Sequence, residues 1–162
     1  MTDTNRTAIM TGSLQGIGAA VVERLAKDGH NVVINYSGNA GPADDLVAKI
    51  EAAGGRAITI KADISNPAVV AGLFSATEQA FGGVDILVNN AGVMKLAPIA
   101  ESEDALLDQH IAVNLKGTFN CLREAGRHMR DDGRVINFSS SVVGFYQPLT
   151  VSTPQPRRTW RR

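Results

Sequence analysis

Short apolar runs alternate along the chain with longer stretches in which apolar residues recur every three or four positions. Runs of this length and composition are typical of buried strands, and the longer stretches are typical of amphipathic helices. We expect strands at residues 7–11, 31–36, 57–61, 84–89 and 134–139. We expect helices at residues 16–28, 42–53, 67–81 and 101–130. This alternation predicts a single α/β domain with a mostly parallel sheet.

Proline and glycine mark the expected helix ends. Pro42 and Pro67 stand where a first helical turn tolerates proline, and Gly29, Gly54 and Gly82 stand where helices commonly stop. Right-handed crossovers between parallel strands then predict a Rossmann-type, doubly wound sheet in the order 3-2-1-4-5. In such a sheet the ligand binds at the carboxyl ends of the strands, here near the first and fourth.

The first strand leads directly into Thr-Gly-Ser-Leu-Gln-Gly-Ile-Gly, residues 11–18. Gly12 permits a tight turn, Gly16 lets the backbone approach a pyrophosphate, and Gly18 lets the following helix pack on the strand. The free N–H groups at the helix start would then face the anion. Glycines also end strands and begin helices for structural reasons, so this segment alone does not decide the function.

A second segment, Asn-Asn-Ala-Gly at residues 89–92, follows the fourth strand. The two segments together resemble the short-chain dehydrogenase/reductase family, in register from about residue 6 to residue 144. Asn-Phe-Ser-Ser-Ser-Val-Val-Gly at residues 137–144 is most similar to the 3-oxoacyl-acyl-carrier-protein reductase branch. The resemblance implies an oxidoreductase that uses a nicotinamide dinucleotide.

The resemblance also implies a set of cofactor contacts along one rim of the sheet, on which Ser139 would also lie. Asp63 and Ile64 would hold the adenine ring, and Asn90 and Gly92 would line the ribose. The Asp-Ile-Ser-Asn-Pro sequence equally predicts a plain turn and helix cap at Asp63. Ser13 and Ile17 would contact the phosphates. The complete expected set is Gly12, Ser13, Gln15, Gly16, Ile17, Gly18, Ser37, Asp63, Ile64, Asn90, Ala91 and Gly92.

The choice between NAD and NADP depends on the end of the second strand. An acidic residue there would bind the ribose 2′-hydroxyl of NAD, and a nearby arginine would bind the 2′-phosphate of NADP. The chain has Asn-Tyr-Ser-Gly-Asn at residues 35–39, and therefore neither. Absence of the acid favours NADP(H) over NAD(H), although Gln15 stands where a basic residue would have strengthened this preference.

Carbonyl reduction needs a proton donor beside the hydride donor. The family supplies an orienting serine, a tyrosine acid, a lysine that lowers the tyrosine pKa, and an asparagine that holds a relay water. Ser141 fits the serine, with Ser139 and Ser140 close by, and Asn114 fits the asparagine. Asn114 lies in an apolar helical stretch, where a plain solvated or back-bonded asparagine is the alternative. The Tyr-x-x-x-Lys motif is absent, since Tyr146 is too near Ser141 and is followed by Thr150.

The end of the chain, residues 147–162, has three prolines, four arginines and no periodic apolar face. We predict a Rossmann domain at residues 1–146 and a disordered tail at residues 147–162. One choice of synonymous codons for residues 149–162 reads Tyr-Ala-Ala-Thr-Lys in another frame, with tyrosine where Thr153 stands and lysine where Arg157 stands. With that choice of codons, a one-base deletion after the Pro148 codon is sufficient to remove the motif. We interpret the chain as a truncated, frameshifted reductase.

Composition limits the other possibilities. The chain has 162 residues, and 16 acidic and 16 basic side chains cancel, which argues against a nucleic-acid or membrane partner. One cysteine, Cys121, excludes an internal disulfide and is typical of a reducing compartment. The sequence contains no metal-binding motif, so we expect no metal site. It contains no apolar run long enough to span a membrane, so we expect a cytoplasmic protein.

Three interpretations compete. The first is an NAD(P)-dependent reductase whose intact parent acts on a small-molecule or acyl carbonyl substrate and forms a homo-oligomer. The second is a non-catalytic dinucleotide-binding fragment. The third is a nucleic-acid contact made by the arginines and Trp160 of the tail, against which the zero net charge stands. A glycine-rich methyltransferase would share the first βαβ unit but would have no use for Asn-Asn-Ala-Gly.

Overall fold

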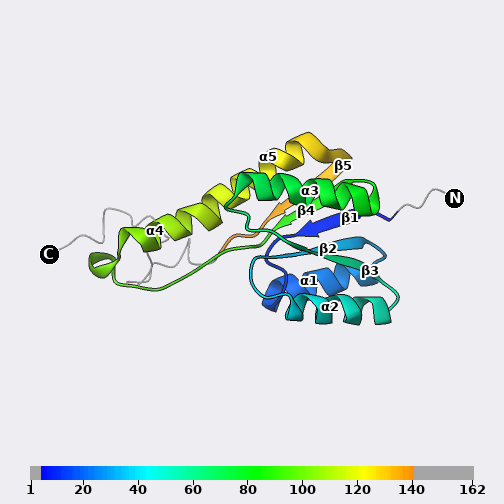
Figure 1. The fold of residues 1–162 in the computed structure, drawn as a ribbon, viewed down its shortest axis with the longest axis horizontal. Helices are drawn as coiled ribbons and strands as arrows, with labels where there is room; N and C mark the ends of the chain where they lie inside the picture. The colour runs from blue at the N-terminus through cyan, green and yellow to red at the C-terminus, as the bar shows by residue number, and fades with distance from the viewer. Residues whose placement is uncertain (1–4, 141–162) are drawn as a thin grey trace.

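The computed structural model describes residues 5–140 and contains one parallel sheet flanked by helices (Figure 1). The strands lie in the order β3-β2-β1-β4-β5, which confirms the order expected from the sequence. Their bounds are β1 (Thr7–Met10), β2 (Asn31–Tyr36), β3 (Arg56–Lys61), β4 (Val84–Asn89) and β5 (Met129–Asn137). The central strand β1 pairs in parallel with β2 and β4, so that Ile9 lies beside both Val33 and Leu87.

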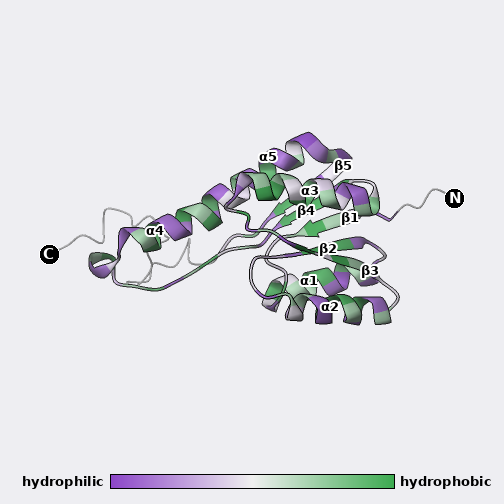
Figure 2. Cartoon of the chain, in the orientation of Figure 1, coloured by the Kyte–Doolittle hydropathy of each residue, from purple (hydrophilic) through white to green (hydrophobic). Residues whose placement is uncertain are grey.

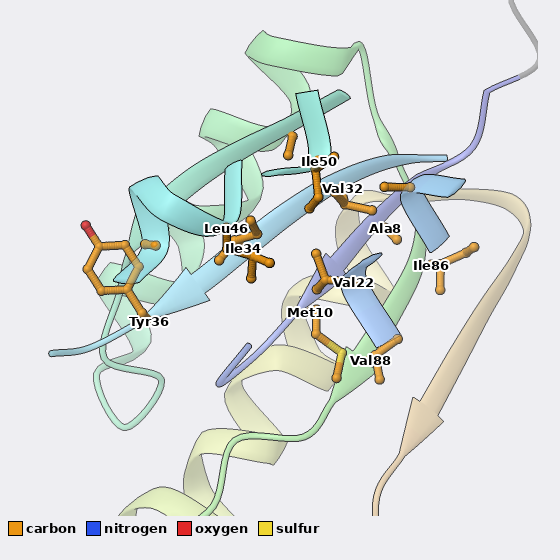
Figure 3. Close-up of a cluster of buried hydrophobic side chains, with 13 residues drawn as sticks. Ala8, Met10, Val22, Val32, Ile34, Tyr36, Leu46, Ile50, Ile86 and Val88 are labelled. Carbon is orange, nitrogen blue, oxygen red and sulfur yellow. The ribbon is translucent and has the colours of Figure 1, made fainter. Parts of the chain in front are cut away.

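Helices cover both faces of the sheet (Figure 1). One face carries α1 (Gly16–Lys27) and α2 (Gly41–Ala52), and the other carries α3 (Pro67–Phe81) and α5 (Thr118–His128). Successive side chains of a strand point to opposite faces, so Ala8 and Met10 join the core under α1 and α2, whereas Ile9 joins the other core. Figure 3 shows the first of these cores. Burial on both faces explains why the strands read as continuous apolar runs.

The predicted helix ends are confirmed at three glycines. Gly29, Gly54 and Gly82 have φ angles of 90°, 83° and 78°, a left-handed conformation that glycine adopts without steric cost. At the other end of α3, the Asn66 side-chain oxygen accepts hydrogen bonds from the N–H groups of Ala68 and Val69. The N-cap of α3 is therefore Asn66. Asp63 lies three residues before this cap.

The single helix expected at residues 101–130 is wrong in detail. The structure has a 3₁₀ turn η1 (Ile99–Glu101), then α4 (Asp104–His110), a π-helical segment η2 (Ile111–Gly117) and α5. Helical structure ends at His128 because the next residue, Met129, already pairs with Val84 in the sheet. In Figure 1, α4 projects beyond the body of the sheet, and Figure 2 shows that it carries apolar as well as polar side chains.

The last described strand also differs from the expected range of 134–139. Strand β5 begins at Met129, and its register with β4 shifts between the Met129–Val84 pair and the Arg134–Ile86 pair. Periodicity missed the first part because this irregular segment contains charged residues and an Asp132 with φ of 62°. In the described sheet β5 is an edge strand, and Val135, Ile136 and Phe138 are 42%, 49% and 43% exposed.

Cys121 is fully buried in the core under α3 and α5, and this burial raises the pKa of its thiol from 9.0 to about 12. We expect no reaction with a thiol reagent such as Ellman's reagent in the native protein, and complete reaction after unfolding in urea. An unfolded thiol ionises near pH 9, whereas the folded thiol keeps its proton, so this group's contribution to stability is lost as the pH rises from 9 towards 12. Fast labelling of the native protein would contradict the buried position.

Candidate dinucleotide site

A hollow of about 740 Å³ lies at the carboxyl ends of the central strands. Four loops reach it: the glycine turn after β1, the end of β2, residues 62–64 after β3, and residues 90–93 after β4. Gln109 of α4 and Val113 of η2 form a further wall. These loops come together because the carboxyl ends of parallel strands share one edge of the sheet.

The glycine turn is packed on one side and open on the other. Gly12 has φ of 62°, and a Cβ atom there would lie 2.7 Å from the Cα of Ala91. A Cβ at Gly18 would lie 2.6 Å from the carbonyl oxygen of Gly12, so the start of α1 sits directly on the turn. Gly16 has φ of 57° and nothing within 4 Å of a Cβ position. The turn thus keeps free space at Gly16, beside the uncapped first turn of α1.

Thr11 and Asn90 hold this turn against the end of β4. The Thr11 hydroxyl oxygen accepts from the backbone N–H groups of Asn90 and Ala91 at 3.0 and 3.1 Å. The Asn90 side-chain amide donates to the carbonyl oxygens of Thr11 and Gly12 at 3.1 and 2.8 Å. The sequence analysis gave Thr11 no role of its own, although Thr11 is the first residue of the glycine segment. Asn90 acts on the backbone of the glycine turn as well as lining the hollow.

Replacing Asn90 by leucine should therefore destabilise the protein. The substitution keeps the size of the side chain but leaves the Thr11 and Gly12 carbonyls without their donor, at an expected cost of about 1–3 kcal/mol in the free energy of unfolding. Urea denaturation measures the change. Asn39→Leu at an exposed position is the control and should stay within about 0.5 kcal/mol. Equal values for the two variants would contradict the role given to Asn90.

The Ser13 side chain is turned into the protein. Its side chain is fully buried, and its hydroxyl lies 3.1 Å from the Met10 carbonyl oxygen and 3.2 Å from that of Asn35. It is the one residue of the turn from Gly12 to Gly18 that does not line the hollow. The hydroxyl ties the turn to β2, and the phosphate contact expected of Ser13 stays a prediction. Gln15, Gly16 and the 62% exposed Ile17 do line the hollow.

The residues expected at the adenine end lie together. Asp63 is exposed, and its carboxylate accepts a hydrogen bond from the N–H of Ser65 at 2.9 Å, which is the predicted turn. Ile64 is buried, and its carbonyl oxygen accepts from the Asn120 amide at 2.9 Å. Ser37 is exposed just beyond the end of β2. All three of Ser37, Asp63 and Ile64 line the hollow.

Asn114 lies in the π-helical segment η2 and holds the loop after β4. Its side-chain oxygen accepts from the N–H of Val93 at 2.8 Å, and its side-chain nitrogen donates to the carbonyl oxygen of Val93 at 2.9 Å. Asn114 is an exposed residue, but its side chain bonds to this loop and not back to its own helix. Ser139 is exposed and does not line the hollow, and Ser141 lies outside the described residues, as does the tail at 147–162.

Known proteins share both this fold and these sequence segments. The short chain dehydrogenase family model matches residues 6–152. An uncharacterized oxidoreductase of Methylorubrum extorquens is 41% identical over 145 residues, which are 90% of this chain and 58% of the relative. A 3-oxoacyl-[acyl-carrier-protein] reductase of Staphylococcus epidermidis is 34% identical over 89% of this chain and 60% of its own length. A short chain dehydrogenase of Burkholderia cenocepacia, solved in complex with NADP, has a TM-score of 0.85 at 37% identity and covers 91% of this chain and 60% of its own.

The chain belongs to the short-chain dehydrogenase/reductase family. It spans about three fifths of the length of these relatives. It shares with this family a Rossmann-type parallel sheet in the order β3-β2-β1-β4-β5. The sequence contains two tyrosines, Tyr36 and Tyr146, and neither is followed by a lysine four positions later. These 162 residues therefore contain no Tyr-x-x-x-Lys sequence.

Two kinds of feature are not found in the part of this short-chain dehydrogenase/reductase that the structure describes. Residues 5–140 contain no cluster of histidine, cysteine and acidic side chains that would hold a metal ion. Over the same residues, no helix combines the length and apolar character needed to span a bilayer.

Proposed function

We propose that the chain binds a nicotinamide dinucleotide, NADP(H) in preference to NAD(H), in the hollow at the carboxyl ends of the strands. The observation that carries this proposal is the glycine turn, which is closed against Ala91 at Gly12 and open at Gly16. No atom lies within 4 Å of the position that a Cβ atom would take at Gly16. A pyrophosphate therefore has room to reach the backbone there. The Burkholderia cenocepacia relative, which was solved with NADP, supports the choice of ligand.

The contacts follow from the placement of the residues. Gln15, Gly16 and Ile17 would surround the pyrophosphate with backbone N–H groups of the first turn of α1. Asp63 and Ile64 would hold the adenine, and Asn90, Ala91 and Gly92 would line the ribose on the nicotinamide side. Ser37 would lie near the 2′ position of the adenosine ribose. Gly12 and Gly18 shape the turn without room for further atoms.

The preference for NADP(H) rests on the absence of an acid where β2 ends, and Ser37 offers a direct test. Ser37→Asp should raise the affinity for NADH and lower that for NADPH, because a carboxylate accepts from a 2′-hydroxyl and repels a 2′-phosphate. A charge-assisted hydrogen bond changes the ratio of affinities by about tenfold or more. Fluorescence titration with both cofactors measures the ratio. Ser37→Asn, of equal size and uncharged, is the control, and an unchanged ratio in Ser37→Asp would argue against this placement.

For the reaction we propose reduction of a ketone, of the 3-oxoacyl or a similar type, by the intact parent of this chain. The bound nicotinamide supplies the hydride for such a reduction. Asn114 would then fix the loop beside the nicotinamide through Val93, and Ser141 would orient the substrate carbonyl. The proton for the carbonyl oxygen has no donor in this sequence, so the chain itself should bind the dinucleotide with little or no turnover.

A non-catalytic dinucleotide-binding fragment is thus the second candidate, and the missing Tyr-x-x-x-Lys motif favours it for this chain. Binding of NADPH without oxidation in the presence of a ketone would distinguish it from an active enzyme. The homo-oligomeric state, the cytoplasmic location and the frameshift stay proposals for the parent.

A further inference from the structure

Two segments that wall the hollow run side by side and are joined by side chains. Gly92 and Val93 lie on one of them, and Gln109 and Val113 lie on the other. Among residues 5–140, the hydrogen bonds between residues 92–98 and the helical stretch 104–117 come from Asn114 and from one more side chain, His110. The expected cofactor and catalytic residues do not include His110.

Both ring nitrogens of His110 have defined backbone partners. Nδ1 lies 2.7 Å from the carbonyl oxygen of Leu106, and Nε2 lies 3.2 Å from the backbone nitrogen of Lys95. A carbonyl oxygen only accepts and a backbone N–H only donates, so Nδ1 carries the proton and Nε2 accepts. His110 is 4% exposed. His110 therefore joins the loop to the last turn of α4 through Lys95.

Besides these side-chain bonds, the described part of the loop has an isolated backbone bridge at Leu96. Met94 and Leu96 are 63% and 49% exposed, so their side chains do not anchor the segment in the core. The two bonds of Asn114 both end on Val93 and fix the loop at one residue. The bond from His110 fixes it at a second residue, two positions further along. Two attachment points set the direction of the loop as well as its position.

We infer that His110 is a positioning residue for the wall formed by Gly92 and Val93, and that it acts on a bound dinucleotide through the backbone of Lys95. This inference rests on the proposed function for its ligand, while the hydrogen bond itself does not. The ring stands behind the wall and does not line the hollow. A loss of the bond would let residues 93–95 move, and the ribose contacts of Gly92 would weaken.

Two substitutions separate the hydrogen bond from the bulk of the ring. His110→Gln keeps an acceptor that can reach the Lys95 N–H, and His110→Met has a similar volume with no such acceptor. We expect His110→Met to speed amide exchange at Lys95 and to weaken NADPH binding, each by about fivefold, the factor of one neutral hydrogen bond. His110→Gln should stay within about twofold of the unchanged protein in both measurements.

The outcomes are distinct. Unchanged Lys95 exchange in His110→Met would overturn the hydrogen bond, and faster exchange with unchanged NADPH affinity would overturn the positioning role. If the unchanged protein does not bind NADPH, the proposed function fails, and Lys95 exchange alone decides the role of the ring in holding the loop. The imidazole nitrogen signals of the unchanged protein give a test that needs no variant: a ring protonated at Nε2 instead of Nδ1 would contradict the inference.

Discussion

Replacing Gly18 by alanine is expected to weaken NADPH binding by about a hundredfold and to lower the free energy of unfolding by about 1–3 kcal/mol. The new Cβ would lie 2.6 Å from the carbonyl oxygen of Gly12 and 2.8 Å from the Cα of Ser13. Both are backbone atoms, so the clash cannot be relieved by turning a side chain. The start of α1 must move away from the turn, and the N–H groups that face the phosphates move with it. Fluorescence titration and urea denaturation measure the two effects.

Gly72→Ala is the matched control for this prediction. Gly72 also lies in a helix, α3, but nothing lies within 4 Å of its Cβ position. Alanine there should leave NADPH binding unchanged and stabilise the protein by about 0.5–1 kcal/mol, because glycine is the poorer helix former. If Gly18→Ala behaved like Gly72→Ala, the close contact between α1 and the glycine turn would not matter for binding.

Correcting the reading frame after the Pro148 codon is expected to raise the rate of NADPH-dependent ketone reduction by about 10²–10⁴ relative to the chain as it stands, which is the usual contribution of general acid catalysis. With the codon choice given above, the corrected frame would place tyrosine where Thr153 stands and lysine where Arg157 stands, twelve and sixteen positions after Ser141. The tyrosine would donate the proton that no residue of the present sequence supplies. The loss of NADPH absorbance with a 3-oxoacyl substrate gives both rates.

The frame-corrected protein with phenylalanine in place of that tyrosine is the control. It keeps every residue that follows in the corrected frame and should fall back to the slow rate while still binding NADPH. Equal rates for the present chain and the frame-corrected protein would refute the assignment of the missing motif. Genomic DNA that encodes residues 149–162 as they stand, with no such motif in another frame, would refute the frameshift itself.

The sequence was sufficient for the sheet because burial on both faces makes its strands uniformly apolar. The apolar run of β1 locates the first strand, and the three glycines after α1, α2 and α3 mark where those helices end. The right-handed crossover rule then gives the strand order. Strand β5 was placed less well, since Met129 pairs in the sheet across an irregular stretch that includes Asp131 and Asp132. The π-helical segment η2 within the predicted long helix has no clear periodic signal, because seven residues are too few to shift the apolar pattern.

At the site, the sequence located the loops but not the direction of each side chain. Ser13 belongs to the glycine turn, yet its hydroxyl turns inward to the Met10 and Asn35 carbonyls, which no local pattern reveals. His110 has a partner 15 residues earlier in the chain, so its role depends on a tertiary contact. Asn114 gave a usable signal because a polar residue inside an apolar helical stretch needs a partner, and Val93 is that partner.

The most direct test of the proposed dinucleotide site is a titration of the full chain with NADPH, followed by the backbone amide signals in NMR spectra. The account predicts saturable shifts at residues 12–18, 37, 63–64 and 90–93, which lie around one hollow at the carboxyl ends of the strands. It predicts no shifts around the second hollow, between α1 and α2, which Lys49 and Ile50 line. Absence of saturable shifts at the glycine turn, or shifts centred between α1 and α2, would contradict it.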